Sequence, residues 1–494
     1  MRQRNSDDRS PLERLGRRFD LVARKTMPDP MVIACGLTIV VVVGALLFPQ
    51  REDMAASGLS ERATTITLLW FNGIWNAAFL TFALQMCVVL LTGYGLAKAP
   101  PAVAVLRYVA TRVKTNRAAV LCVAAVSCVG CWINWGFGLI AAGILATELR
   151  AALERRGVKC RYALIVAGAY SGMMIWHGGL SGSAPLKVAE QGVSITRTAD
   201  GSGARHTLDP IDVSQTVLAP TTLVLSVLFL IGVPLVLRAM APAEDGRSAD
   251  PGGARQSPAT RSNDLTSQAT LDEQNLSLAD RANRSRLIPA MIALIAVFAL
   301  GILLRRHGTQ AIGLNFVNTV FLILGLALHR NLGEYVSAVA EGGRAVTGIV
   351  MQFPLYGGIQ AVMFGTGLAV SLSVGFVRGS AWVAEVTNLS TGTTFPVGVF
   401  FSAAVVNLFV PSGGGQWIVQ GPIMCGAADA LRLPIAQTVM AVSYGDEWTN
   451  MIQPFWAIPL MGLTGVNARK FIGYCALLML LSMPVFVLAL VLLY

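Results

Sequence analysis

Charged side chains are scarce in this sequence: 13% of its 494 residues are Asp, Glu, Lys or Arg, whereas 54% are hydrophobic. Soluble domains carry about 25% charged residues. Half that share, together with repeated long apolar runs, is typical of a polytopic membrane protein. We therefore expect an all-α chain that crosses a lipid bilayer many times.

Metal and nucleotide motifs are also lacking. The chain has only four histidines and no Cys/His cluster, which argues against a transition-metal site. Cys128-Val-Gly-Cys131 has redox spacing, but it lies in an apolar stretch where small residues favour close helix packing. No glycine-rich phosphate motif followed by Lys and Ser/Thr is present. We expect no cofactor and no ATP-driven transport by this chain alone.

The net charge of +11 indicates topology rather than nucleic-acid binding, since Lys and Arg concentrate in cytoplasmic loops. Residues 1–30 are basic and predicted to be cytoplasmic. Counting spans from there predicts nine transmembrane helices, two re-entrant hairpins and an external C-terminus. A homodimer is one assembly open to such a protein.

Two interrupted apolar stretches predict the hairpins. The stretch 118–147 has basic residues on both sides, which a hairpin entering and leaving on the cytoplasmic side explains better than a single span. The stretch 393–431 contains Pro411-Ser-Gly-Gly-Gly415, which we interpret as a non-helical tip because glycine disfavours helix. A glycine-rich surface loop between two short helices is the alternative interpretation.

The two halves of the chain share an order of features. A hairpin with a glycine-rich tip precedes a span broken just after a tyrosine, and the two hairpins have opposed flanks. This pattern is typical of inverted-topology repeats, whose broken helices meet near the midplane. The predicted division is as follows: first repeat 31–240 with its broken helix at 162–189, disordered cytoplasmic linker 241–286, joining helix 287–304, and second repeat 311–494 with its broken helix at 434–465. The first broken helix is expected to break around Trp176–Pro185 and the second at Tyr444–Asn450, while Glu190–Gln215 and Ser371–Thr391 are expected to be external.

Polar residues beside the breaks are the candidate substrate ligands. Hydroxyl and amide groups can donate hydrogen bonds to an anion, and neighbouring glycines let backbone N–H groups approach it. A helix-packing role for any one serine is an equally good explanation. The candidates are Asn134, Gly136, His177, Ser181, Ser183, Asn407, Ser412, Gly413, Gly414, Gln416 and Asn450.

Ionisable residues at membrane depth are costly, so a functional role is the default hypothesis for them. His177 suits a proton relay, and Asp446 suits a proton or sodium. Glu447 has a structural pairing as its alternative role, and Thr449 completes the ion-coupling candidates. No Lys or Arg is obvious in the broken segments, which favours a monoanionic substrate.

The runs that carry a family resemblance include Asn134–Leu139, Trp176–Ser183, Pro354–Gly358, Val410–Trp417 and Gly445–Pro454. At these runs the chain resembles the bacterial short-chain fatty acid transporter family, which is related to the divalent-anion/sodium symporters of the ion-transporter superfamily. The resemblance implies an inner-membrane carrier for short-chain fatty acids such as butyrate or acetoacetate, driven by protons or sodium. The alternatives are a carrier for C4-dicarboxylates or another small anion, an anion channel, and a membrane enzyme, which no nucleophile elbow supports.

Overall fold

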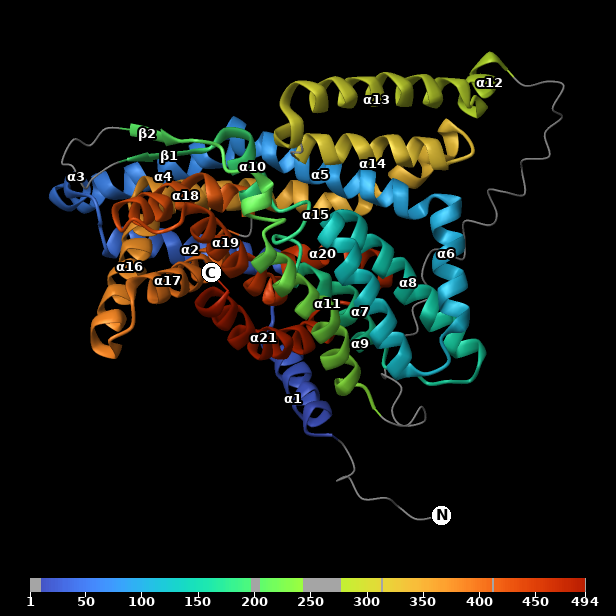
Figure 1. The fold of residues 1–494 in the computed structure, drawn as a ribbon, viewed down its shortest axis with the longest axis horizontal. Coiled ribbons are helices and arrows are strands. Elements are labelled where there is room, and N and C mark those ends of the chain that lie inside the picture. The colour runs from blue at the N-terminus through green and yellow to red at the C-terminus, as the bar shows by residue number, and fades with distance from the viewer. Residues whose placement is uncertain (1–9, 197–204, 243–276, 312–313, 411–412, 494) are drawn as a thin grey trace, which may run out of the picture.

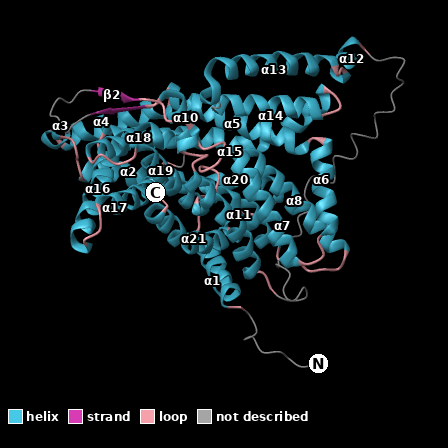
Figure 2. Ribbon diagram, viewed as in Figure 1, coloured by secondary structure: helices cyan, strands magenta, loops and turns pink. Residues whose placement is uncertain are grey.

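The computed structural model describes the chain except for residues 1–9, 197–204, 243–276, 312–313, 411–412 and 494. Its described regular structure is almost entirely helical, as expected (Figure 2). The exception is an antiparallel pair of short strands, β1 (Val193–Thr196) and β2 (Arg205–Leu208), in the segment predicted to be external.

The helices follow the apolar runs of the sequence. Those before the undescribed segment 243–276 are α1 (Pro11–Thr26), α2 (Pro30–Leu47), α3 (Glu52–Ala56), α4 (Leu59–Ile74), α5 (Ala77–Lys98), α6 (Pro100–Arg112), α7 (Asn116–Ile133), α8 (Trp135–Arg155), α9 (Tyr162–Tyr170), α10 (Ser183–Gln191) and α11 (Pro220–Met240). Those after it are α12 (Leu278–Arg284), α13 (Leu287–His307), α14 (Leu314–Leu328), α15 (Leu332–Gly365), α16 (Leu368–Thr387), α17 (Thr391–Phe409), α18 (Gly413–Ala430), α19 (Ile435–Thr449), α20 (Pro454–Thr464) and α21 (Ile472–Leu492).

Seven of the described helices are long and apolar enough to cross a membrane, and two bent pairs raise the number to nine. The seven include both arms of the first hairpin, α7 and α8, and one arm of the second, α17. The sequence assigned these three helices to re-entrant hairpins and not to spans. The nine candidate spans of the structure are therefore not the same nine that the sequence predicts. The described chain has the composition of a multi-pass membrane protein, whereas re-entrance and the inverted repeat stay predictions.

Two groups of helices are visible in Figure 1. Helices α13, α14 and α5 run side by side along one edge of the molecule, and α15 packs on α5 and α4. The hairpin α7–α8 lies in the other group with α9, α11, α20 and α21. Helices α17, α18 and α19 pack on one another, and α10 joins α18 to α19. The broken helices of both predicted repeats thus meet inside the second group.

Three predicted boundaries are wrong. Ser371–Thr391 was expected as an external loop, but α16 covers most of it and exposes Trp382 and Val386 as a lipid-facing helix would. The second broken helix breaks at 450–453 rather than 444–450, because Gln453 precedes Pro454 and proline disfavours helix in the residue before it. The first break covers 171–182, earlier than the predicted run around Trp176–Pro185.

The glycine run of the second hairpin is helical, contrary to expectation. Gly413 to Gly415 form the first turn of α18, and the rest of the predicted tip, residues 411–412, lies outside the described residues. The cost of placing glycine in a helix is its large backbone entropy. The helix also packs on α19 and α10, and tertiary packing overrides weak local propensity.

The two polar segments of the sequence are partly folded. The linker 241–286 lies mostly outside the described residues, but its end forms helix α12, so the prediction of disorder is wrong there.

In the basic N-terminal segment, α1 is an amphipathic helix that packs on α21 and α11. Glu13 lies 3.6 Å from the Arg161 guanidinium, and both side chains are buried. This contact joins the N-terminal segment to the start of α9.

Gly473 lets α1 approach the backbone of α21, and we expect Gly473→Ala to dislodge α1. A Cβ at Gly473 would lie 2.5 Å from the backbone of Asp20, so one helix must move. Overpacking of this kind costs about 1–3 kcal/mol. Trypsin should then cut α1 faster in detergent-solubilised protein. Gly462→Ala is the control, because its Cβ meets nothing within 4 Å and its cleavage should match wild type.

Candidate functional site

A hydrogen-bonded group of His177, Asp446 and Glu447 lies where the two broken helices meet. His177 Nδ1 is 2.7 Å from Asp446 Oδ2. The backbone N–H groups of His177 and Gly178 both donate to Glu447 Oε2, at 2.8 and 3.2 Å. All three side chains are 0–1% exposed. The structure thus brings together the three ionisable residues that the sequence singles out.

The protonation of His177 follows from its hydrogen bonds. Its Nε2 accepts from the backbone N–H of Ala184 at 3.0 Å, so that nitrogen carries no proton. The ring proton is on Nδ1 and points at Asp446. Held by these two hydrogen bonds, the ring is placed to orient Asp446. Asp446 is then the better candidate than His177 for exchanging a cation.

Helix α18 begins directly against this pair. A Cβ on Gly413 would lie 2.6 Å from Cε1 of His177 and 3.2 Å from Oδ2 of Asp446. The N-terminus of α18, the positive end of its helix dipole, therefore lies beside the Asp446 carboxylate. The other oxygen of that carboxylate, Oδ1, is buried and has no hydrogen-bond partner among the described residues. A cation could bind there without displacing His177.

Asn407, near the end of α17, ties the second hairpin to the second break. Its Nδ2 donates to the Asp446 carbonyl, Thr449 Oγ1 and Asn450 Oδ1 at 2.7–3.0 Å. The backbone carbonyl of Asn407 accepts from Gln453 Nε2 at 2.6 Å. Three acceptors around one amide nitrogen fix the orientation of the Asn407 side chain, so its Oδ1 points away from them. Thr449 and Asn450 thus belong to the same cluster as Asn407.

Asn134 has the matching place in the first hairpin. It is the single residue between α7 and α8, where its Oδ1 caps α8 by accepting from the Phe137 N–H at 2.9 Å. Ser181 Oγ accepts from the Trp135 N–H at 3.1 Å, and the Leu180 N–H donates to the Trp132 carbonyl at 2.7 Å. The hairpin tip is therefore fastened to the first break.

Several predicted ligands have other partners or positions. Gln416 Nε2 already donates to the Ala403 carbonyl and to Gln420, so it is not free to bind a carboxylate. Gly136 packs against the backbone of Val89, since a Cβ there would lie 2.9 Å from its carbonyl oxygen. Ser183 begins α10 and is half-buried, and Gly414 lies in the first turn of α18. Ser412 lies outside the described residues.

Tyr170 and Gln453 were missed as site residues. The Tyr170 hydroxyl lies 2.7 Å from the Asn450 carbonyl and 2.8 Å from the Gln453 carbonyl, which joins the first break to the second. The sequence pattern places a tyrosine just before each break. Nothing in the local sequence, however, predicts that Tyr170 hydrogen-bonds to a residue 280 positions away. Gln453 could have been suspected as the polar residue before Pro454 in an apolar run.

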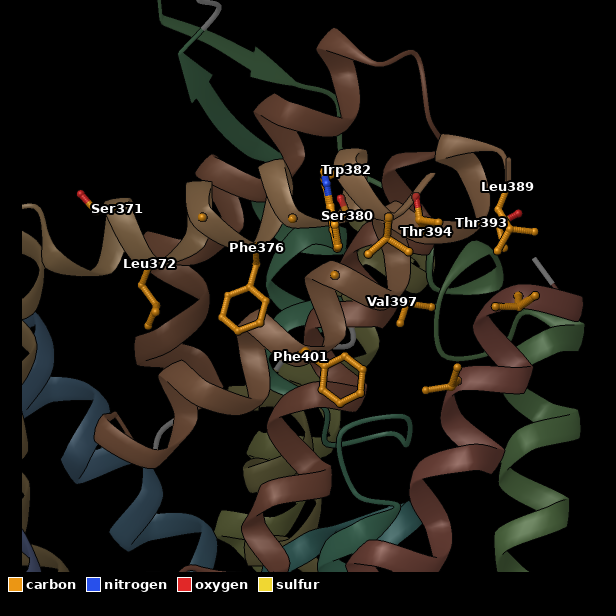
Figure 3. A pocket seen from close by; sticks show the side chains of 16 residues that line it. Ser371, Leu372, Phe376, Ser380, Trp382, Leu389, Thr393, Thr394, Val397 and Phe401 are labelled. Atoms are coloured by element: carbon orange, nitrogen blue, oxygen red, sulfur yellow. The ribbon is translucent and has the colours of Figure 1, made fainter. Parts of the chain in front are cut away.

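A separate apolar cavity of about 780 Å³ opens between α16, α17 and α21 (Figure 3). Phe376, Trp382 and Phe401 line it together with aliphatic side chains and a few hydroxyls. It contains none of the buried polar cluster described above, and none of its lining residues is charged. It therefore offers no counter-charge for a carboxylate, and the candidate site remains the meeting point of the helix breaks.

The fold and the site define a multi-pass membrane protein whose polar residues are buried at helix breaks. Among the described residues, no group of three or more His, Cys, Asp or Glu side chains is arranged to hold a metal ion. The family model described as "Short chain fatty acid transporter" matches residues 11–493. The chain belongs to this family, and it is a transporter rather than an enzyme.

Curated relatives agree with this assignment. A protein of Escherichia coli is 34% identical over 97% of this chain and 99% of its own length. One of Haemophilus influenzae is 32% identical over the same shares of the two chains. Both are named "Putative short-chain fatty acid transporter".

Two solved transporter structures are similar at lower levels. The Alcanivorax borkumensis YdaH transporter has 17% identity and a TM-score of 0.44, covering 94% of this chain and 97% of that one. Neisseria gonorrhoeae MtrF, described as illuminating a class of antimetabolite efflux pumps, has 15% identity and a TM-score of 0.40, with 94% coverage of each chain. Scores this low say nothing about the topology or substrate of the present chain.

Proposed function

We propose that this transporter imports short-chain monocarboxylates of the butyrate and acetoacetate class across the bacterial inner membrane, coupled to a proton or sodium gradient. The observation that carries the proposal is the buried carboxyl pair at the meeting helix breaks. Asp446 and Glu447 are each about 1% exposed, and their hydrogen-bond partners are the His177 ring and the backbone amides of His177 and Gly178. A buried charge without a basic partner is costly, so a bound cation would relieve it.

Monocarboxylates fit this site better than dicarboxylates. No Lys or Arg is a hydrogen-bond or ion-pair partner of His177, Asp446 or Glu447 in the described part of the chain. A dianion would bring two negative charges next to two carboxyl groups. A monoanion carried with one cation adds no net charge to the site. This supports the sequence-based preference for a substrate bound by dipoles and hydrogen bonds.

Two buried side-chain oxygen atoms keep sodium as a candidate coupling ion beside the proton. Asp446 Oδ1 and Asn407 Oδ1 are buried oxygens without a partner among the described residues, and hard cations bind such oxygens. The inward direction, the cytoplasmic N-terminus with an external C-terminus, the homodimer and the kinship with divalent-anion/sodium symporters remain predictions. Each rests on the charge pattern or the resemblance of the sequence.

Uptake of labelled butyrate into proteoliposomes tests the function, with sodium and pH gradients imposed independently. Saturable accumulation above that of protein-free liposomes, driven by one gradient and abolished by its ionophore, is the expected result. The protein-free control is needed because uncharged short-chain acids cross bilayers unaided. Uptake that is never concentrative would instead indicate a channel. Strong competition by succinate would indicate a dicarboxylate carrier.

A further inference from the structure

Buried polar atoms without hydrogen-bond partners are sorted by chemical type between the two halves of the site. Near the first hairpin and first break the unpartnered atoms are N–H donors, whereas near the second they are mainly oxygens. These are atoms for which the described residues supply no partner. The donors are Trp132 Nε1, Asn134 Nδ2 and Trp176 Nε1, and the oxygens are Asn407 Oδ1, Gln416 Oε1, Asp446 Oδ1 and Gln453 Oε1, with Asn450 Nδ2 as the exception.

The three donors belong to one interlocked piece of structure. Trp132 and Asn134 flank the tip of the α7–α8 hairpin, and the Leu180 N–H donates to the Trp132 carbonyl. Trp176 lies four residues before Leu180, and its ring is edge-on to Trp135 with centroids 6.4 Å apart. The amide of Asn134 also lies at the N-terminus of α8, where the helix dipole favours a negative charge.

We infer that the carboxylate of the substrate binds to this first-half donor set, with the indole N–H of Trp176 and the amide of Asn134 as its hydrogen-bond donors. The inference rests on the proposed function, since it assigns the anion half of that site. Two carboxylate oxygens offer several acceptor positions, so one carboxylate can satisfy both donors. The unpartnered oxygens of the second half are then left for the cation.

Trp176 is suited to this role because an indole donates and never accepts. Its N–H remains a donor at every physiological pH, and a buried one without an acceptor is unfavourable until a ligand supplies it. The ring is 2% exposed and stacks on His177, with centroids 4.4 Å apart and planes at 18°. The stack places the indole beside the residue that orients Asp446, so anion and cation would bind next to each other.

Trp176→Phe is the direct test, because phenylalanine keeps an aromatic ring on His177 and removes only the N–H donor and part of the ring. We expect the KM for butyrate uptake to rise about ten- to a hundredfold, as for a lost hydrogen bond to a charged group, with Vmax changed much less. Trp70→Phe is the matched control. Its indole N–H is also buried and unpartnered among the described residues, but it lies on α4 against Gly358.

A second measurement does not depend on a folded variant. Wild-type protein labelled with ¹⁵N in its nine tryptophan indoles is titrated with butyrate in detergent, and one buried indole N–H signal should move downfield at saturation. A wild-type KM in a well-inserted Trp176→Phe variant would overturn the inference, as would unmoved indole signals at saturating butyrate. Absence of butyrate uptake by the wild-type protein would overturn the proposed function itself, and this assignment with it.

Discussion

Replacing Asp446 with asparagine is expected to abolish the accumulation of butyrate against its gradient while the protein still inserts. Asparagine keeps an oxygen that can accept the 2.7 Å hydrogen bond from His177, so the meeting of the two breaks is retained. It removes the charge that would attract a cation. With one cation carried per carboxylate, a tenfold cation gradient supports about tenfold accumulation. The ratio of internal to external butyrate should therefore fall from about ten to about one.

Two further variants sharpen this result. Glu447→Gln keeps an oxygen for the two backbone N–H groups of the first break, so we expect slower uptake with the accumulation ratio largely kept. Ser443→Ala is the control on the same helix, since that hydroxyl donates to the Val439 carbonyl one turn earlier. Normal accumulation by the asparagine variant would mean that Asp446 does not carry the coupling ion.

Asn134→Asp is expected to have the second large effect, a nearly complete loss of butyrate uptake. Aspartate is as good a helix cap as asparagine, so the bond from the Phe137 N–H to residue 134 should persist. The change replaces the free amide donor by a charged oxygen at a fully buried position. Two like charges about 4 Å apart repel by about 4 kcal/mol at an effective dielectric constant of 20, which is roughly a thousandfold in affinity.

Asn134→Ser separates repulsion from damage to the fold. Serine also caps helices well but adds no charge, so we expect a KM increase of only about tenfold with near-normal insertion. Insertion is measured by size-exclusion chromatography of both variants, and uptake by labelled butyrate at matched protein. If the two variants transport equally well, Asn134 does not contact the substrate carboxylate.

The ionisable residues of the site could be predicted from the sequence, because an ionisable side chain in an apolar run has a high free-energy cost. His177, Asp446 and Glu447 stand out for that reason alone, and the structure places them within hydrogen-bonding distance. Their roles were less accessible. The sequence offers His177 as a proton relay, which stays a prediction, and only the structure shows that its Nε2 accepts from the Ala184 N–H while its Nδ1 faces Asp446.

Local propensity misled where packing decides the backbone. The glycines at 413–415 disfavour helix in isolation, yet they open α18 because that helix packs on α19 and α10, and packing overrides weak local propensity. Residues 371–387 lack the length of uninterrupted hydrophobicity that marks a span, yet they continue as α16 after the bend at Gly367. Gly367 adopts a left-handed conformation with φ of 82°, which ends α15 and redirects the chain.

The sequence by itself determined the class of protein, the course of most apolar helices and the residue types gathered near the breaks, because burial in lipid acts on each segment separately. Only the tertiary structure decided which polar atoms are satisfied. Tyr170 finds its acceptors 280 and 283 positions away, and Asp446 meets His177 across 269. A hydrogen bond is a property of a pair, so the unpartnered donors and oxygens that define the two halves of the site emerge only when the distant segments pack together.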